Sequence, residues 1–185
     1  MKTIKAIKFL SIALLTLGLS SCRNNDTPED VHEHEEVNKI KVTYTNTSTK
    51  ITQEAVFQTG SLVSKDAINL VSGQSYDVNL TFYHNHDGKD EDLTSEVIKD
   101  KDEHFVKYKF SDIGIDLVRA EDDTKRTDGK KLGLKTRWTV TSAPQNGASV
   151  GIQLMHQSTV ISDSGIGVTK EGTGSPDVNA FFEIK

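Results

Sequence analysis

Alternation of apolar and polar residues is the dominant pattern over most of the chain. Residues 76–84 give the clearest case, with Tyr76, Val78, Leu80 and Phe82 on one side. Residues 39–44 and 104–110 alternate in the same way, which is typical of half-buried β-strands. Shorter or less regular apolar runs, separated by turn residues, follow at 51–57, 67–71, 115–118, 132–141, 148–159 and 178–184.

This pattern predicts an all-β fold, namely an antiparallel, immunoglobulin-like β-sandwich of about eight or nine strands. A β-barrel is the alternative, because its strands also have one buried and one solvated face. One short helix is expected from about residue 92 to 102, where Leu93 and Val97 stand one turn apart.

Turn residues give two local expectations. Residues 132–141 and 148–159 are predicted to form a hairpin around the Pro144-Gln145-Asn146-Gly147 turn. The run 86–92 contains four acidic residues without the spacing of a calcium loop, so a solvated loop is expected there.

The first 22 residues follow a different pattern. Lys2, Lys5 and Lys8 precede an apolar run at 9–19, and Ser20-Ser21-Cys22 follows it. This order is typical of a secretory signal peptide whose cleavage site is a lipobox, with Cys22 as the lipidated residue. The alternative, a transmembrane anchor, needs about 20 apolar residues, and this run is too short.

The domain organisation follows from this reading. We expect a signal peptide at 1–21, a disordered acidic tether at 22–36 and one β-sandwich domain at 37–185. The tether has six acidic residues, His32 and His34, and too few apolar residues to bury a core.

Charge and cysteine content restrict the chemistry. Removing residues 1–21 leaves 19 basic and 27 acidic residues, a balance that disfavours nucleic acid as a partner. Cys22 is the only cysteine. If lipid occupies it, neither a disulfide nor a thiolate metal site can form, and metal binding falls to the histidines.

Parity places three histidines with the apolar faces of their strands. His84 continues the series that begins at Tyr76, His104 begins the series of Val106, and His156 ends the series of Leu154. If the first two strands run antiparallel as neighbours, His84 and His104 lie at one end of the sandwich, where His156 joins them. With Glu103, His86 or Asp87 nearby, such a set suits a tetrahedral zinc site, or two of the imidazoles suit axial ligation of haem iron.

Other interpretations of the histidines remain open. A histidine at a strand end is often a packed rim residue that donates to a carbonyl. In the tether, His32 and His34 alternate with carboxylates and form a second hypothetical site, for zinc or copper. A merely solvated acidic linker is the alternative there.

Several stretches resemble a family of small envelope lipoproteins of Bacteroidota. They are HEHEEVNKIKVTYTN, LVSGQSYDVNLTF, EDLTSEVIKDKDEHFVKYKF, ASVGIQLMHQ and DVNAFFEIK. Members are similar in a Glu-His pair, here Glu103-His104, and in a histidine that ends a late strand, here His156. The chain departs from them in its additional His84-Asn85-His86.

The resemblance implies an outer-membrane lipoprotein, on either its periplasmic or its surface face, that works beside a TonB-dependent transporter. Some members carry a label for a periplasmic substrate-binding fold, whereas the near absence of helical periodicity here favours the all-β fold.

The predicted function is therefore a lipid-anchored binding protein for a metal ion or metal complex, with zinc, copper or haem as candidates. The alternative is a structural or interaction lipoprotein that binds protein or glycan and uses its histidines for packing. Neither a catalytic triad nor a nucleophile elbow is recognisable, so an enzyme is not expected.

Overall fold

The computed structural model describes residues 36–157, 161–162, 168–169 and 174–185. All of them belong to one compact unit, which spans Glu35–Lys185. The predicted lipidation site Cys22 and the tether histidines His32 and His34 lie outside the described residues. Among the residues that are described, no helix is both long and apolar enough to cross a membrane.

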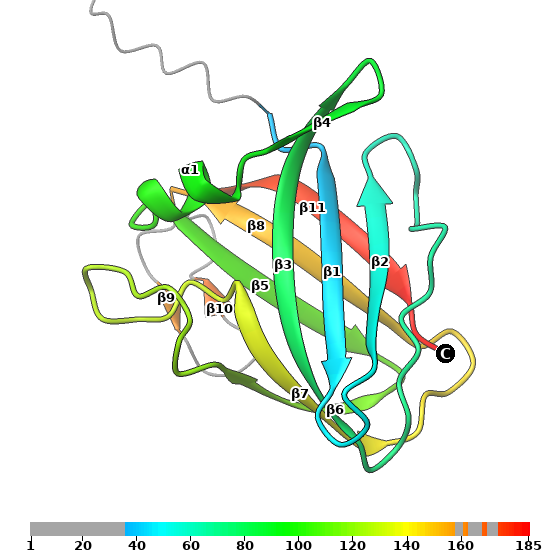
Figure 1. Cartoon of the computed structure of the whole chain (residues 1–185). Helices are drawn as coiled ribbons and strands as arrows, with labels where there is room; N and C mark the ends of the chain where they lie inside the picture. Colours follow the sequence, from blue (N-terminus) through cyan, green and yellow to red (C-terminus); the bar gives the residue numbers. More distant parts are fainter. Residues whose placement is uncertain (1–35, 158–160, 163–167, 170–173) are drawn as a thin grey trace, which may run out of the picture. The chain divides into compact units, whose positions relative to one another are not determined.

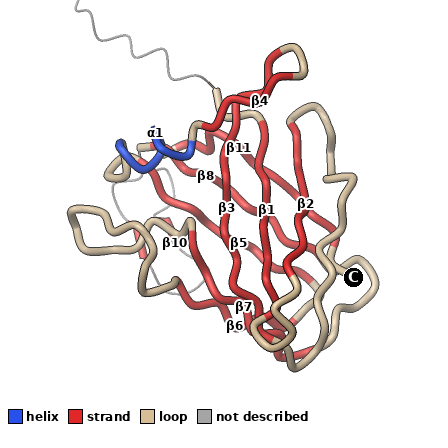
Figure 2. The backbone as a smooth tube through the Cα atoms, in the orientation of Figure 1, coloured by secondary structure: helices blue, strands red, loops and turns tan. Residues whose placement is uncertain are grey.

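The domain consists of strands with one short helix (Figures 1 and 2). In chain order the elements are β1 (Lys39–Asn46), β2 (Thr52–Gln58), β3 (Ser75–His86), β4 (Lys89–Asp92), α1 (Thr94–Lys99), β5 (His104–Ser111), β6 (Gly114–Arg119), β7 (Lys135–Ser142), β8 (Ser149–His156), β9 (Ile161–Ser162), β10 (Val168–Thr169) and β11 (Ser175–Glu183). The strand count exceeds the expected eight or nine because β4, β9 and β10 are short additions.

Two antiparallel sheets form the layers of a sandwich. The larger sheet has the order β2-β1-β3-β7-β6, with β4 pairing to β3 beyond this path, and the smaller sheet has the order β11-β8-β5. In Figure 1 the strands of the smaller sheet pass behind β1, β2 and β3. The predicted all-β sandwich is confirmed, and the described strands do not close into a barrel.

Aromatic side chains hold the two sheets together. Trp138 of β7 is fully buried and meets Tyr108 and Phe110 of β5 edge to face, at centroid distances of 5.8 and 5.1 Å. Phe57 of β2 meets Phe182 of β11 in the same way at 6.3 Å. Aromatic pairs in this geometry contribute about 0.5–1.5 kcal/mol each beyond the burial of their area.

The segment around residues 64–68, between β2 and β3, covers the neighbouring edges of both sheets. On the β11 side, the Ser64 amide donates to the Phe181 carbonyl, and Ile68 forms an isolated parallel bridge with Ile184. On the β2 side, the Ser64 hydroxyl donates to the carbonyl of Val56. The apolar run at 67–71 is therefore an edge cover rather than a strand.

The predicted hairpin around Asn146-Gly147 is wrong. β7 lies between β3 and β6 in the larger sheet, whereas β8 is the central strand of the smaller sheet. A turn does form, because the Ala148 amide donates to the Gln145 carbonyl, but the Gln145 amide donates to the Asp112 carbonyl. That contact directs the chain across to the other sheet, which turn residues alone do not specify.

The expected acidic loop is itself a hairpin. β4 pairs with the end of β3 in the register His86 to Lys89 and His84 to Glu91. The connecting residues Asp87 and Gly88 both have positive φ, 52° and 77°, as a two-residue Asp-Gly hairpin turn requires. The helix that follows is shorter than expected and begins after Leu93, with the Thr94 amide donating to Asp92 Oδ1 at 2.9 Å.

Candidate metal centre

His104 and His156 are direct cross-strand partners. His104 begins β5, His156 ends β8, and the two residues face each other in the register of the smaller sheet. Their rings stack with centroids 4.9 Å apart and an interplanar angle of 21°. Only 7% of the His104 side chain and 19% of the His156 side chain are exposed.

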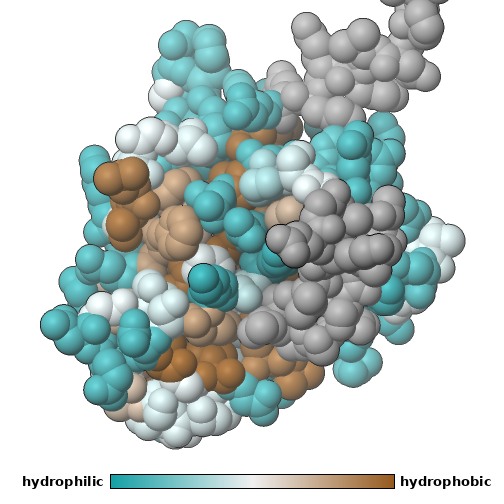
Figure 3. Space-filling model, turned by 180° about the vertical axis from the view of Figure 1, so that it is seen from behind, coloured by the Kyte–Doolittle hydropathy of each residue, from teal (hydrophilic) through white to brown (hydrophobic). Residues whose placement is uncertain are grey.

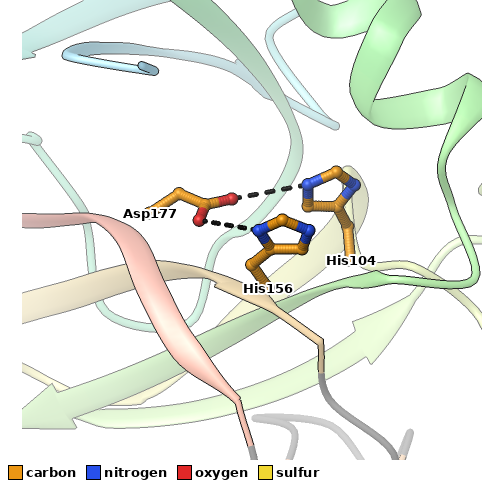
Figure 4. Close-up of side chains that lie close together, drawn as sticks. All are labelled: His104, His156 and Asp177. Atoms are coloured by element: carbon orange, nitrogen blue, oxygen red, sulfur yellow. Dashed lines mark ion pairs between the residues drawn. The ribbon is translucent and has the colours of Figure 1, made fainter. Parts of the chain in front are cut away.

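Asp177 brings a carboxylate to both rings from the third strand of the sheet. Its Oδ2 lies 3.4 Å from His104 Nε2, and its Oδ1 lies 3.4 Å from His156 Nδ1 (Figure 4). The register of β11 against β8 shifts between Pro176 and Val178, so Asp177 is an extra residue in the ladder. Such bulges re-aim a side chain, and here the bulge directs Asp177 toward the histidines.

In each ring, the nitrogen that does not face Asp177 also has a hydrogen-bond partner. His104 Nδ1 donates to the Asp100 carbonyl at 3.0 Å, and His156 Nε2 lies 3.1 Å from Glu103 Oε2. Outer partners of this kind fix the orientation and tautomer of metal-binding histidines. Each ring is thus positioned to present its other nitrogen to Asp177.

A buried arginine fixes the backbone at the start of β5. Arg126, in the charged segment 121–131, donates through Nη1 to the carbonyls of His104 and Lys101 at 2.6 and 3.1 Å. In the same segment, Thr127 donates to Asp102 through both its amide and its hydroxyl, at 2.6 Å each. This segment therefore holds the residues on either side of Glu103 in place.

The three inner side chains match the donor set of a metal ion. His104, His156 and Asp177 each offer a ligand atom, and these atoms lie within 4.8 Å of one another. Ligand atoms bound to a tetrahedral zinc ion at 2.0–2.2 Å lie roughly 3.3–3.5 Å apart. Each imidazole nitrogen lies 3.4 Å from one oxygen of Asp177, a distance in this interval, and the two contacts use different oxygens of the carboxylate.

The structure gathers part of the predicted set. His104, His156 and Glu103 come together, with Glu103 as an outer partner. His84 does not join them, because β3 belongs to the larger sheet and is not a neighbour of β5. Its Nδ1 donates instead to the Glu36 carbonyl at 2.9 Å.

Sequence reasoning missed Asp177 and Arg126. The apolar series Val178, Ala180 and Phe182 assigns Asp177 to the outer face, and the bulge reverses that assignment. Arg126 stands in a charged run that reads as a solvated loop, although the structure buries it. No feature of the sequence marks either residue.

A scan against protein-family models, a search of curated proteins and a search of solved structures each found no match to this chain. The resemblance to Bacteroidota lipoproteins therefore remains a prediction.

Proposed function

We propose that the protein binds a divalent transition-metal ion, with zinc as the first candidate. The ligands are His104 Nε2, His156 Nδ1 and the carboxylate of Asp177. The observation that carries this proposal is the position of Asp177, whose two oxygens each lie 3.4 Å from an imidazole nitrogen of a different strand.

The hydrogen bonds of His104 support a cation at this place. The Asp100 carbonyl can only accept, so a neutral His104 carries its proton on Nδ1. Its Nε2 then directs a lone pair toward the Asp177 carboxylate, and the two electron-rich groups repel each other. A metal ion between them converts this repulsion into coordination.

The side-by-side arrangement of the rings favours a single ion over haem. Two axial histidines approach haem iron from opposite faces of the porphyrin. His104 and His156 are stacked 4.9 Å apart and face the same carboxylate, so they are not placed on opposite sides of a porphyrin.

The predicted lipobox supplies the cellular setting of this proposal. Lipid on Cys22 anchors the domain to the outer membrane through the acidic tether, where it is available to a TonB-dependent transporter. Metabolic labelling with a palmitate analogue tests the anchor: labelling is expected for the wild type and lost in Cys22→Ala. Labelling that persists in Cys22→Ala contradicts it.

The second candidate is a non-catalytic interaction lipoprotein whose histidines only pack. Two observations favour it. Protonated His104 and His156 would donate to the same acceptors that the structure places around them. Apolar side chains also reach the surface on the face shown in Figure 3. Independently of that view, Leu62, Val63 and Phe181 are exposed apolar residues.

Zinc titration of the purified full-length protein separates the two candidates. Calorimetry is expected to show a saturable binding step that disappears in His104→Ala and in His156→Ala. Gln153→Ala, a change elsewhere on β8, is the matched control and should leave this step intact. A titration that is the same in all four proteins rejects the metal centre and leaves the interaction lipoprotein.

A further inference from the structure

The β3–β4 hairpin carries a second pair of histidines away from the sandwich core. His84 and His86 alternate with Asn85 on β3 and therefore point to the same face. Glu91 of β4 is the cross-strand partner of His84, which places its carboxylate on that face as well. Two imidazoles and one carboxylate thus project from one side of the hairpin.

Both rings have Nδ1 next to a local acceptor. His84 Nδ1 donates to the Glu36 carbonyl at 2.9 Å, and His86 Nδ1 lies 3.4 Å from Asp87 Oδ2. The rings are nearly parallel, with an interplanar angle of 10° and centroids 6.1 Å apart. His84 is therefore arranged to present Nε2, the usual ligand atom when Nδ1 is bound to an acceptor.

The surroundings can admit an ion and attract it. His84, His86 and Glu91 line a surface hollow of about 460 Å³ together with Lys89 and Asp90. The run 86–92 holds four acidic residues and one lysine, so its charge favours a cation. Lys39, which forms an ion pair with Asp90 at 2.5 Å, holds the pKa of that carboxyl below its ordinary value.

We propose that His84, His86 and Glu91 form a second, open site for a divalent ion of borderline softness, Zn²⁺ or Cu²⁺. Imidazole nitrogens and a carboxylate oxygen are the ligands that such ions take. Binding requires the two rings to turn so that their Nε2 atoms approach each other. The His86 side chain is 77% exposed and has room for this rotation. The site binds more weakly than the buried centre, because its ligands must reorganise and remain in water.

Zinc titration in a His32→Ala/His34→Ala background tests the site without a contribution from the tether. Two binding steps are expected, one for each histidine pair. His86→Ala should weaken the weaker step at least tenfold and leave the tighter step intact, while His104→Ala should do the reverse. Lys89→Ala should strengthen the weaker step, because it removes a cation from the hollow.

Two results overturn this inference. One is an isotherm that His86→Ala does not change. The other is a weaker step that disappears in Asp87→Asn/Asp90→Asn but persists in His86→Ala, which would assign it to the acidic turn alone. Since His86 is exposed, a thermal melt of His86→Ala should match the parent and show that the fold is unchanged. Because the two sites use different residues, failure of one leaves the other standing.

Discussion

The part of the chain that the structure describes contains two pairs of histidines, which differ in how the backbone holds them. His104 and His156 come from neighbouring strands, stack inside one end of the smaller sheet and share a carboxylate from a third strand. His84 and His86 come from a single strand and project from a hairpin in which every residue of β4 is exposed. In the first pair burial and three strands fix the geometry, whereas in the second pair two strands and the solvent leave it adjustable.

This contrast shows how the backbone and the neighbouring residues at a strand end position a histidine. At the buried pair, the backbone supplies the Asp100 carbonyl and the Asp177 bulge, and Arg126 holds the His104 carbonyl. At the hairpin pair, only the Glu36 carbonyl plays a comparable part among the residues that the structure describes. We therefore expect tight, selective binding at the first pair and weaker, less selective binding at the second.

The largest effect is expected from Asp177→Asn. This change removes the charge that both rings address, so zinc affinity at the buried centre should fall by more than the 10–100-fold typical of outer-partner changes. Competition with a chromogenic chelator measures the loss. Glu183→Gln, an exposed change on the same strand, is the matched control. Equal affinities of the two variants would contradict the role of the bulge.

Glu103→Gln should have the next largest effect on zinc binding. Glu103 does not contact His156 Nδ1, the nitrogen that faces Asp177. It accepts a hydrogen bond from His156 Nε2. Its loss should weaken zinc binding by about 10–100-fold without abolishing it. Glu96→Gln on α1 changes an exposed carboxylate of the same kind and should leave the affinity unchanged. A complete loss of binding in Glu103→Gln would instead make Glu103 a direct ligand.

The stability of the two pairs should also differ. His104→Ala removes a buried ring that stacks on His156, and the free energy of unfolding of the metal-free protein should fall by about 1–3 kcal/mol. His86→Ala removes an exposed ring and should stay within about 0.5 kcal/mol of the parent. Urea denaturation followed by tryptophan fluorescence reports both. Similar losses of unfolding free energy in the two variants would contradict the expectation that the buried ring contributes more to stability than the exposed one.

Tyr108→Phe should lower stability by less than the upper end of the range for His104→Ala, and it tests the packing of β5 without changing a histidine. Burial raises the pKa of Tyr108, whose hydroxyl donates to the Gly133 carbonyl at 2.7 Å. The folded protein thus retains the phenol proton above pH 10, where the unfolded chain releases it, so this group makes the free energy of unfolding fall with rising pH.

The variant should lose about 1 kcal/mol at neutral pH and show a shallower decline above pH 10. Chemical denaturation at pH 8 and at pH 10.5 measures both quantities, with Tyr83→Phe, a half-buried position on β3, as the control. An unchanged alkaline decline in Tyr108→Phe would show that other groups cause it.

Alternation made the strands and the inward direction of His104 and His156 predictable. Both histidines continue strict apolar series, and no bulge interrupts these series between the histidines and the core. The pairing of strands was harder to predict from the sequence, because it depends on contacts between residues that are far apart in the chain. His84 illustrates this limit: its parity is that of the core residues, but its strand belongs to the other sheet.

Turn residues mark a hairpin at one position and not at another. The Asp87-Gly88 pair is a strong hairpin signal, and the acidic residues around it obscured that signal. Asn146-Gly147 is the same kind of signal, but no hairpin forms there, because the chain passes from the larger sheet to the smaller one. Asp177 shows a further limit, because one inserted residue in a ladder reverses the direction that counting assigns.

The position of β11 has a consequence for biosynthesis. Asp177 follows every other described strand of the two sheets in the chain, and the strand that carries it pairs with β8 and is covered at its edge by residues around Ile68. A nascent chain that lacks these last residues has both histidines but no carboxylate between them. The proposed metal centre therefore cannot assemble on a partly synthesised domain, and we expect it to bind metal only after the final strand has docked.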